Sequence, residues 1–335
     1  MPFRRKAGAA LLALMAAAAL AADILAVNAP SHQFSDFVYA PPMPPRVIDA
    51  SGRWRRPFVY PLRLENRLER RFSEDRQNPM RLRFFADAAL VSVGDDAMSP
   101  WFPLGTDALG RDVLARLVLG ARISLGVAFV AAAGALLLGA SAGAVAGYFG
   151  GYLDDGVMWM ADFVIALPAI YVVLALRAAA PLVLTTRQIF WIMVSVFILA
   201  GWPLAARTVR AVIAAERTRE YAEAARSIGA GSARLLLRHL LPATRGLLAA
   251  QATLLLPAFI LAEATLSFVG LGFGEPVPSW GLMLQDAGRG RALADAPWLL
   301  APAAAIALVV LAVNLVSPNA TSGGLYSSHR RKPRS

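Results

Sequence analysis

The stretch ISLGVAFVAAAGALLLGASAGAVAG, residues 123–147, contains no charged side chain. Apolar runs of about 18 residues or more are typical of helices that span a membrane. One similar run precedes this stretch and four follow it, at residues 7–27, 157–176, 189–206, 247–270 and 297–316. The sequence therefore predicts an all-α membrane protein with about six transmembrane helices.

The composition agrees with a membrane protein. Hydrophobic residues make up 57% of the chain and charged residues 16%, whereas soluble domains carry about 25% charged residues. The absence of cysteine excludes a disulfide framework, a thiol nucleophile and a thiolate metal site. The net charge of +11 comes almost entirely from arginines that flank the apolar runs. No basic helix or aromatic RNA-binding pattern accompanies them, so nucleic acid is not an expected partner.

Arginine placement predicts the orientation in a bacterial inner membrane. Short loops rich in Lys and Arg stay in the cytoplasm, and residues 207–245 carry eight arginines. Counting spans then places residues 1–6 and the basic tail, residues 318–335, in the cytoplasm. Residues 28–118 fall on the periplasmic side despite their 13 arginines, because long loops cross regardless of charge. We expect that segment to have some strand or helix of its own.

The first apolar run has two interpretations. Basic residues followed by an apolar core also describe a cleaved signal peptide. The run at residues 7–27 is about 20 residues long, which fits a spanning helix better. Either way, residue 28 emerges on the periplasmic side.

A row of glycines predicts close helix packing. Gly139, Gly143 and Gly147 recur every four residues and therefore lie on one face of a helix. Small residues at this spacing let a second helix approach closely.

The segment between the fourth and fifth apolar runs predicts a helix-turn-helix on the cytoplasmic surface. Residues 219–228 are rich in helix formers, and Gly229 and Gly231 follow where the helix should end. A second helix is expected over residues 233–241 before Pro242. Its expected apolar face consists of Leu235, Leu236, Leu237, Leu240 and Leu241. The small side chains of Ala224 and Ala225 leave room for another protein surface.

The sequence does not predict an enzyme. A Walker A loop needs a lysine after its glycines, and neither Lys6 nor Lys332 has that setting. No HExxH or GxSxG motif occurs, and the three histidines are too far apart to suggest a metal site. We therefore expect no catalytic residue, no metal and no cofactor bound directly by this chain.

Two acidic residues lie inside predicted spans. Charges in the bilayer usually face a cavity or a partner. Asp162 and Glu263 are therefore candidates for lining or gating a translocation path. The structural alternative is an ion pair, for instance Asp162 with Arg207 or Arg210, or a hydrogen-bonded cap.

Four stretches resemble one family of membrane proteins. Glu223, Ala224, Ala225, Gly229, Leu241 and Pro242 match the spacing of the "EAA" signature of ATP-binding-cassette importer permeases. GTDALGRDVLAR, AEATLSFVGLG and PSWG, at residues 105–116, 262–272 and 278–281, are similar to elements of the oligopeptide and dipeptide subfamily. The resemblance spans about residues 100–316 and is strongest to the C-type subunit. The tail after Val316 departs from the usual pattern.

The resemblance implies a type I importer permease fold over residues 119–317. It implies a heterodimer with a sister permease, two separate ATPase subunits that use ATP, and a periplasmic substrate-binding protein. The segment at residues 213–243 would couple to the ATPases through Glu220, Glu223, Ala224, Ala225, Gly229, Leu241 and Pro242. Peptides are the implied cargo, with nickel, glutathione or oligosaccharides as alternatives. Two more remote alternatives are a membrane-anchored periplasmic binding or enzymatic module, formed by residues 28–118, and an ATP-driven exporter.

Overall fold

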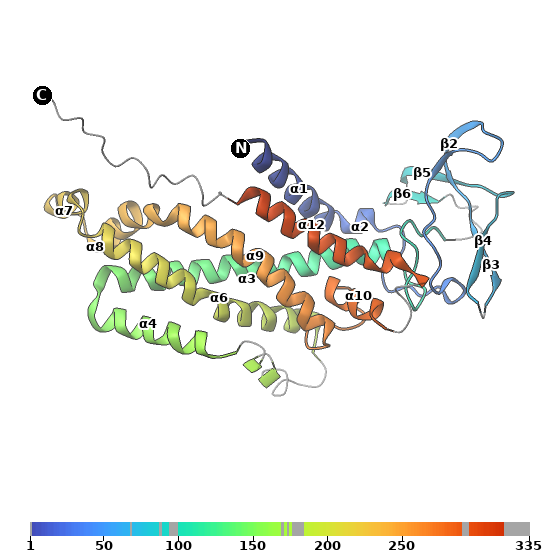
Figure 1. Ribbon diagram of the computed structural model, residues 1–335. Coiled ribbons are helices and arrows are strands. Elements are labelled where there is room, and N and C mark those ends of the chain that lie inside the picture. The colour runs from blue at the N-terminus through green and yellow to red at the C-terminus, as the bar shows by residue number, and fades with distance from the viewer. Residues whose placement is uncertain are drawn as a thin grey trace, which may run out of the picture.

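The computed structural model describes residues 2–67, 69–86, 89–93, 100–168, 171–172, 174–175, 184–289 and 295–317. These residues form an elongated bundle of helices with a small β-sheet region at one end (Figure 1). The helix α7 lies at the opposite end of the bundle from the strands. The basic tail at residues 318–335 lies outside the described residues.

Long helices build the bundle. They are α1 (Pro2–Leu20), α3 (Val113–Phe149), α4 (Gly151–Ala166), α6 (Thr186–Glu216), α9 (Arg245–Phe268) and α12 (Ala301–Val316). Short helices join them: α2 (Ala22–Leu25), α7 (Glu220–Ser227), α8 (Ser232–Leu235) and α10 (Trp280–Ala287). Single turns occupy Leu236–Leu240, Leu241–Thr244 and Pro297–Leu300.

Four helical stretches of the described chain are long and apolar enough to cross a membrane: Val113–Phe149, Thr186–Glu216, Ser232–Phe268 and Pro297–Val316. Of the other two predicted spans, the first corresponds to α1 and α2, which break at Ala21. The predicted span at residues 157–176 begins inside α4, but much of its second half lies outside the described residues. The membrane-protein class is confirmed, and the count of six stays a prediction.

Two helices extend past their predicted ends into stretches that carry charged residues. The helix α3 begins at Val113 rather than residue 123, since the Asp112 carboxylate accepts hydrogen bonds from the backbone N–H groups of Leu114 and Ala115. The helix α6 continues to Glu216 rather than residue 206. Arg207 and Arg210 lie within this extension and pair with acidic residues of α4.

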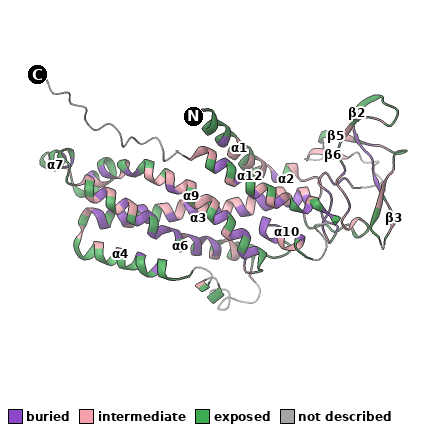
Figure 2. Ribbon diagram, in the orientation of Figure 1, coloured by how far each residue is buried: buried purple, intermediate pink, exposed green. Residues whose placement is uncertain are grey.

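The pair α3 and α6 forms the centre of the bundle, and Figure 2 shows buried residues along both helices. A Cβ on Gly139 would lie 2.6 Å from the carbonyl oxygen of Trp202. A Cβ on Gly143 would lie 2.2 Å from that of Ala206. The row continues at Gly147 against Arg210. The close approach predicted from the glycine spacing is therefore confirmed.

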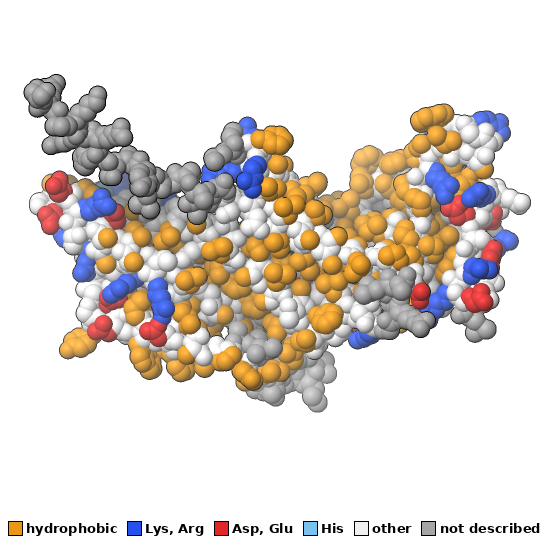
Figure 3. All heavy atoms as spheres, viewed as in Figure 1, with side chains coloured by type: hydrophobic (Ala, Val, Ile, Leu, Met, Phe, Trp, Pro, Cys, Tyr) orange, Lys and Arg blue, Asp and Glu red, His pale blue; other side chains and the backbone are white. Residues whose placement is uncertain are grey.

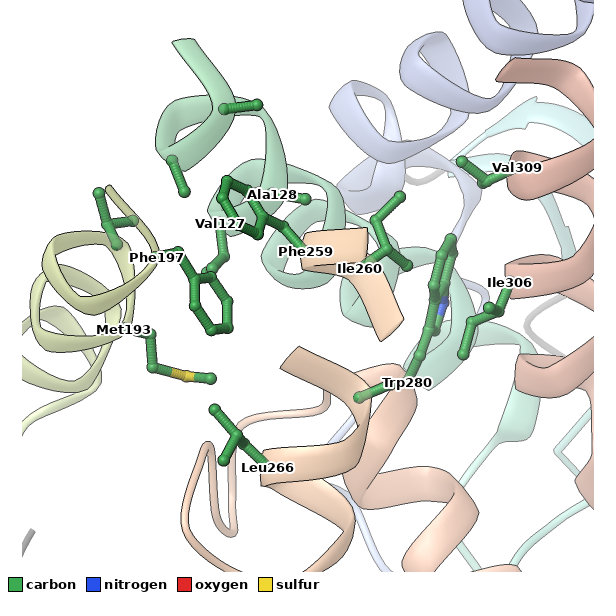
Figure 4. Packing of buried hydrophobic residues seen from close by; sticks show 14 of the residues in the cluster. Val127, Ala128, Met193, Phe197, Phe259, Ile260, Leu266, Trp280, Ile306 and Val309 are labelled. Atoms are coloured by element: carbon green, nitrogen blue, oxygen red, sulfur yellow. The ribbon is translucent and has the colours of Figure 1, made fainter. Parts of the chain in front are cut away.

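An apolar core fills the half of the bundle nearer the sheet. Phe197 of α6 stacks on Phe259 of α9 with ring centroids 5.2 Å apart. Ile260 and Trp280 extend the same cluster towards α12 (Figure 4). Burying side chains of this size contributes about 1.5–3 kcal/mol each. This core fixes α9 and the short helix α10 relative to α3.

The region between α2 and α3 contains β-strands. A four-stranded antiparallel sheet has the order β1-β2-β5-β6, and β3 pairs with β4. The strands are β1 (Arg46–Ile48), β2 (Trp54–Val59), β3 (Leu62–Asn66), β4 (Arg71–Glu74), β5 (Met80–Ala86) and β6 (Ala89–Val93). Val59, Met80, Trp101 and Phe102 belong to the small core beneath them. The all-α class therefore holds for the bundle, while this segment has a small core of its own.

The visible face of the molecule separates apolar from charged side chains. Hydrophobic side chains cover much of the middle, and Arg, Asp and Glu side chains gather towards both ends (Figure 3). This distribution fits a protein whose middle faces hydrocarbon and whose ends face water.

Candidate functional site

The helix α7 ends in a tight, well-bonded turn. The N–H of Gly229 donates to the carbonyl of Arg226 at 2.9 Å, and that of Ala230 donates to Ala225 at 3.0 Å. This is the Schellman pattern, which needs a left-handed residue after the helix. Gly229 supplies it with φ of +85°. The predicted break at Gly229 is therefore confirmed, and its geometry requires glycine or a strained substitute.

The second predicted helix is not regular. Only Ser232–Leu235 is α-helical, and a π turn and a 3-10 turn follow before α9. Pro242 lacks the N–H that an α-helical bond to residue 238 would need. Leu235 and Leu240 are buried, whereas Leu237 is exposed. The prediction that Leu237 shares the apolar face was therefore wrong.

The helix α7 is fastened to the ends of α3 and α6. The Arg217 guanidinium donates to the carbonyl of Tyr148 at 2.8 Å. Arg226 donates in turn to the carbonyl of Arg217 at 3.1 Å. The Tyr221 hydroxyl donates to the Glu216 carboxylate at 2.8 Å. Two hydrogen bonds thus tie the short helix to the end of α6, and the third ties that end to α3.

The predicted coupling residues divide between two faces. Ala222 and Ala225 pack inward with Val209, Ile213 and Leu235. Ala225 therefore leaves no room for a partner, contrary to expectation. On the open side, Glu220, Glu223, Ala224 and Gly229 are exposed, and Leu241 and Pro242 are half-buried. Ile228, the residue after α7, is 87% exposed, so the open side carries an apolar side chain as well as carboxylates.

Asp162 forms the ion pair that the sequence offered as the structural alternative. Its carboxylate contacts the Arg207 guanidinium. About two turns before Asp162 in α4, the Asp154 carboxylate accepts a hydrogen bond from Arg210 Nε at 2.8 Å. These two pairs link α4 to α6. A role for Asp162 in gating stays a prediction.

Glu263 is fully buried in the described chain. Its Oε1 accepts from the Ser267 hydroxyl at 2.8 Å, and Ser124 and Ser279 flank the same carboxyl. The carboxyl therefore meets side chains from α3, α9 and the residue that caps α10. Lining of a path by Glu263 also stays a prediction.

A buried ion network at the other end of the bundle was not anticipated. Arg111 and Arg116 converge with Asp107, Glu275 and Asp286. Arg111 and Arg116 lie in the stretch at residues 105–116 that the family resemblance had singled out. Their partners are up to 175 residues away, so the spacing carried no signal for the contact.

Comparison with known proteins identifies the family. The family of inner membrane components of binding-protein-dependent transport systems matches residues 135–320, more than half of the chain. The chain belongs to this family. This family comprises the permease subunits of ATP-binding-cassette importers. The protein is therefore a transport subunit of the inner membrane and not an enzyme.

Two relatives show the extent of the likeness. The dipeptide transport system permease protein DppC of Alkalihalophilus pseudofirmus is 37% identical over 64% of this permease and 68% of its own length. The oligopeptide transport system permease protein OppC of Bacillus subtilis has the same identity and coverage. A structure of the MetNI methionine ABC transporter matches 60% of this permease and 96% of its own chain, with 18% identity and a TM-score of 0.44.

Proposed function

We propose that this permease imports peptides as one half of a heterodimer. We also propose that Glu220–Pro242 contacts separate ATPase subunits and transmits their movement to the membrane helices. The observation that carries the coupling proposal is α7 itself. It is a short helix, exposed on one face and packed on the other, through Ala222 and Ala225, with residues of α3 and α6. A partner that pushes α7 would move both helices together.

The proposed orientation follows from charge. Residues 207–245 carry eight arginines and include α7, so this end lies in the cytoplasm. The strands at the opposite end of the bundle (Figure 1) then lie in the periplasm, where a substrate-binding protein delivers its cargo. Both termini are cytoplasmic in this arrangement, and residues 28–118 form the periplasmic segment.

The proposed cargo rests on the relatives, which are named for dipeptide and oligopeptide transport. Nickel, glutathione and oligosaccharides are the alternative cargoes of the same machinery. Uptake of labelled di- and tripeptides by cells that express the complete transporter tests the choice. Competition by an excess of glutathione or an oligosaccharide, with no competition by peptides, would overturn it.

Two substitutions test the coupling role. Glu223→Lys reverses an exposed charge on α7, and Gly229→Asp places a side chain where φ is +85°. Left-handed conformations cost most L-residues about 1–2 kcal/mol, with Asp and Asn among the more tolerant, so Gly229→Asp tests the turn by adding a charge to its exposed side as well as strain. We expect both variants to insert into the membrane normally, to lose uptake and to lose the ATPase stimulation that accompanies transport.

Gly246→Asp is the matched control. Gly246 lies in the first turn of α9 with no positive φ, and a Cβ there meets nothing within 4 Å. This variant should retain uptake. Wild-type uptake by both Glu223→Lys and Gly229→Asp would overturn the coupling assignment.

A further inference from the structure

The proposed function leaves unexplained why three of the family-like stretches meet around α10. The first of them supplies Arg111, which is 3% exposed and uses its whole guanidinium. Nε lies 2.7 Å from Asp107 Oδ2, Nη1 lies 2.6 Å from Glu275 Oε2, and Nη2 lies 3.1 Å from Asp286 Oδ2. One side chain thus joins the segment before α3, the loop between α9 and α10, and α10 itself.

Arg116, from the second turn of α3, doubles this connection. It is 1% exposed, and its Nη2 lies 3.1 Å from Glu275 Oε1. Its Nε lies 3.5 Å from the same Asp107 oxygen. We call Asp107, Arg111, Arg116, Glu275 and Asp286 the outer ion network.

Glu275 is the most exposed acid of this network. Arg111 and Arg116 carry two positive charges, and Asp107 and Asp286 carry two negative ones, with all four side chains at most 13% exposed. Glu275 adds a third carboxylate, whose side chain is 44% exposed. Arg289 adds a third guanidinium, 3.3 Å from Asp286 and 70% exposed. Breaking a buried pair is costly because it leaves an uncompensated buried charge. Release of Glu275 gives its carboxylate to water but takes from Arg116 the contact at 3.1 Å, which leaves Arg116 with Asp107 at 3.5 Å and Asp286 at 3.8 Å. The contact therefore holds the loop until the loop is displaced.

The start of α10, by contrast, is held by neutral and tightly packed contacts. The Trp280 N–H donates to the Ser124 hydroxyl at 3.2 Å, and its indole N–H donates to the Leu117 carbonyl at 3.0 Å. A Cβ on Gly281 would lie 2.3 Å from the carbonyl oxygen of Ala264. The α9–α10 loop at residues 269–279 therefore has a fixed end at α10 and a releasable contact at Glu275.

We propose that Arg111 and Arg116 are positioning residues that latch the α9–α10 loop through Glu275, and that the transporter releases this latch when its periplasmic end opens. The proposal rests on the proposed function, because it needs a transport cycle. It assigns the network a step in that cycle rather than a role in folding alone. Arg is required at position 111, because lysine cannot reach three carboxylates at once.

The absence of cysteine allows a direct test. Leu20 and Gly274 are exposed, and a Cβ on Gly274 meets nothing within 4 Å. Nitroxide labels on Leu20→Cys and Gly274→Cys, in the complete reconstituted transporter, report the position of the loop by pulsed electron paramagnetic resonance. We expect the distance distribution to shift between the nucleotide-free state and the state trapped with ATP and binding protein.

Glu275→Gln then separates latching from folding. In the nucleotide-free state this variant should already show the shifted distribution, while Glu69→Gln, on an exposed acid of the sheet region, should match the parent. Identical distributions for Glu275→Gln and the parent, or no shift of the parent between states, would overturn the latch. Peptide uptake by the labelled parent is measured separately. Its absence would contradict the proposed function, whereas normal uptake with an unmoved loop would contradict the latch alone.

Discussion

The packing of α3 on α6 can be tested by adding a single methyl group. Gly143→Ala places a Cβ 2.2 Å from the carbonyl oxygen of Ala206 and 2.9 Å from its carbonyl carbon. Close carbon–oxygen contacts between helices are about 3.3 Å. The two backbones must therefore separate by about 1 Å at this point, which also loosens the contacts of Gly139 and Gly147.

The expected cost is the balance of two terms. Overpacking a close contact typically costs about 1–3 kcal/mol. Replacing glycine by alanine inside a helix recovers about 0.5–1 kcal/mol. We expect Gly143→Ala to destabilise the protein by about 1–2 kcal/mol.

Gly126→Ala on the same helix is the control. A Cβ there meets only Phe190, at an ordinary distance of 3.7 Å, so this variant should be neutral or slightly more stable. Unfolding of both variants is followed in one detergent by heat or by titration with a denaturing detergent. Equal stability of Gly143→Ala and Gly126→Ala would refute the packing argument.

Two further predictions concern charged groups. Burial raises the pKa of Asp112 to about 6, so the contribution of this carboxyl to folding stability is largest at low pH and is lost as the pH rises through about 6. The contribution amounts to about 3 kcal/mol at most. Asp112→Asn should therefore lose stability relative to the parent as the pH falls from 7 to 4, and a constant difference in melting temperature over this range would contradict this. Asp162→Asn leaves Arg207 without its partner and should lower accumulation in the membrane, while Asp162→Asn with Arg207→Gln restores it. Normal accumulation of the double variant without uptake would instead indicate that the pair serves the translocation path.

The parts of the fold that sequence predicted are those governed by local chemistry. The spacing of Gly139, Gly143 and Gly147 was sufficient to predict the close helix contact, because residues four apart lie on one face of a helix. The end of α7 at Gly229 was predictable because glycine is the usual residue where a helix ends. The regular helix expected after Gly231 was not, because a π turn replaces it over Leu236–Leu240 and Leu237 is exposed.

The ends of the helices and the site contacts depended on partners far along the chain. Arg207 and Arg210 interrupted the apolar pattern, but arginine is a good helix former, so α6 continues through both and pairs them with Asp162 and Asp154. The resemblance singled out Arg116, but Glu275 is 159 residues away. No pattern in one sequence links residues at such a separation, so the outer ion network required three-dimensional information.

The same two helices connect both proposed working parts. Arg217 at the end of α6 bonds the carbonyl of Tyr148 near the end of α3 and so ties in α7. Arg116, near the other end of α3, belongs to the outer ion network. Between these ends the glycine row brings the two backbones into contact, which leaves little room for either helix to slide independently. A displacement applied at α7 would therefore reach the latch as a movement of the whole α3–α6 pair, because a tightly packed pair shifts as one body more readily than it bends. On the proposed function, this is how a subunit without a Walker A loop of its own would respond at one end to a partner at the other.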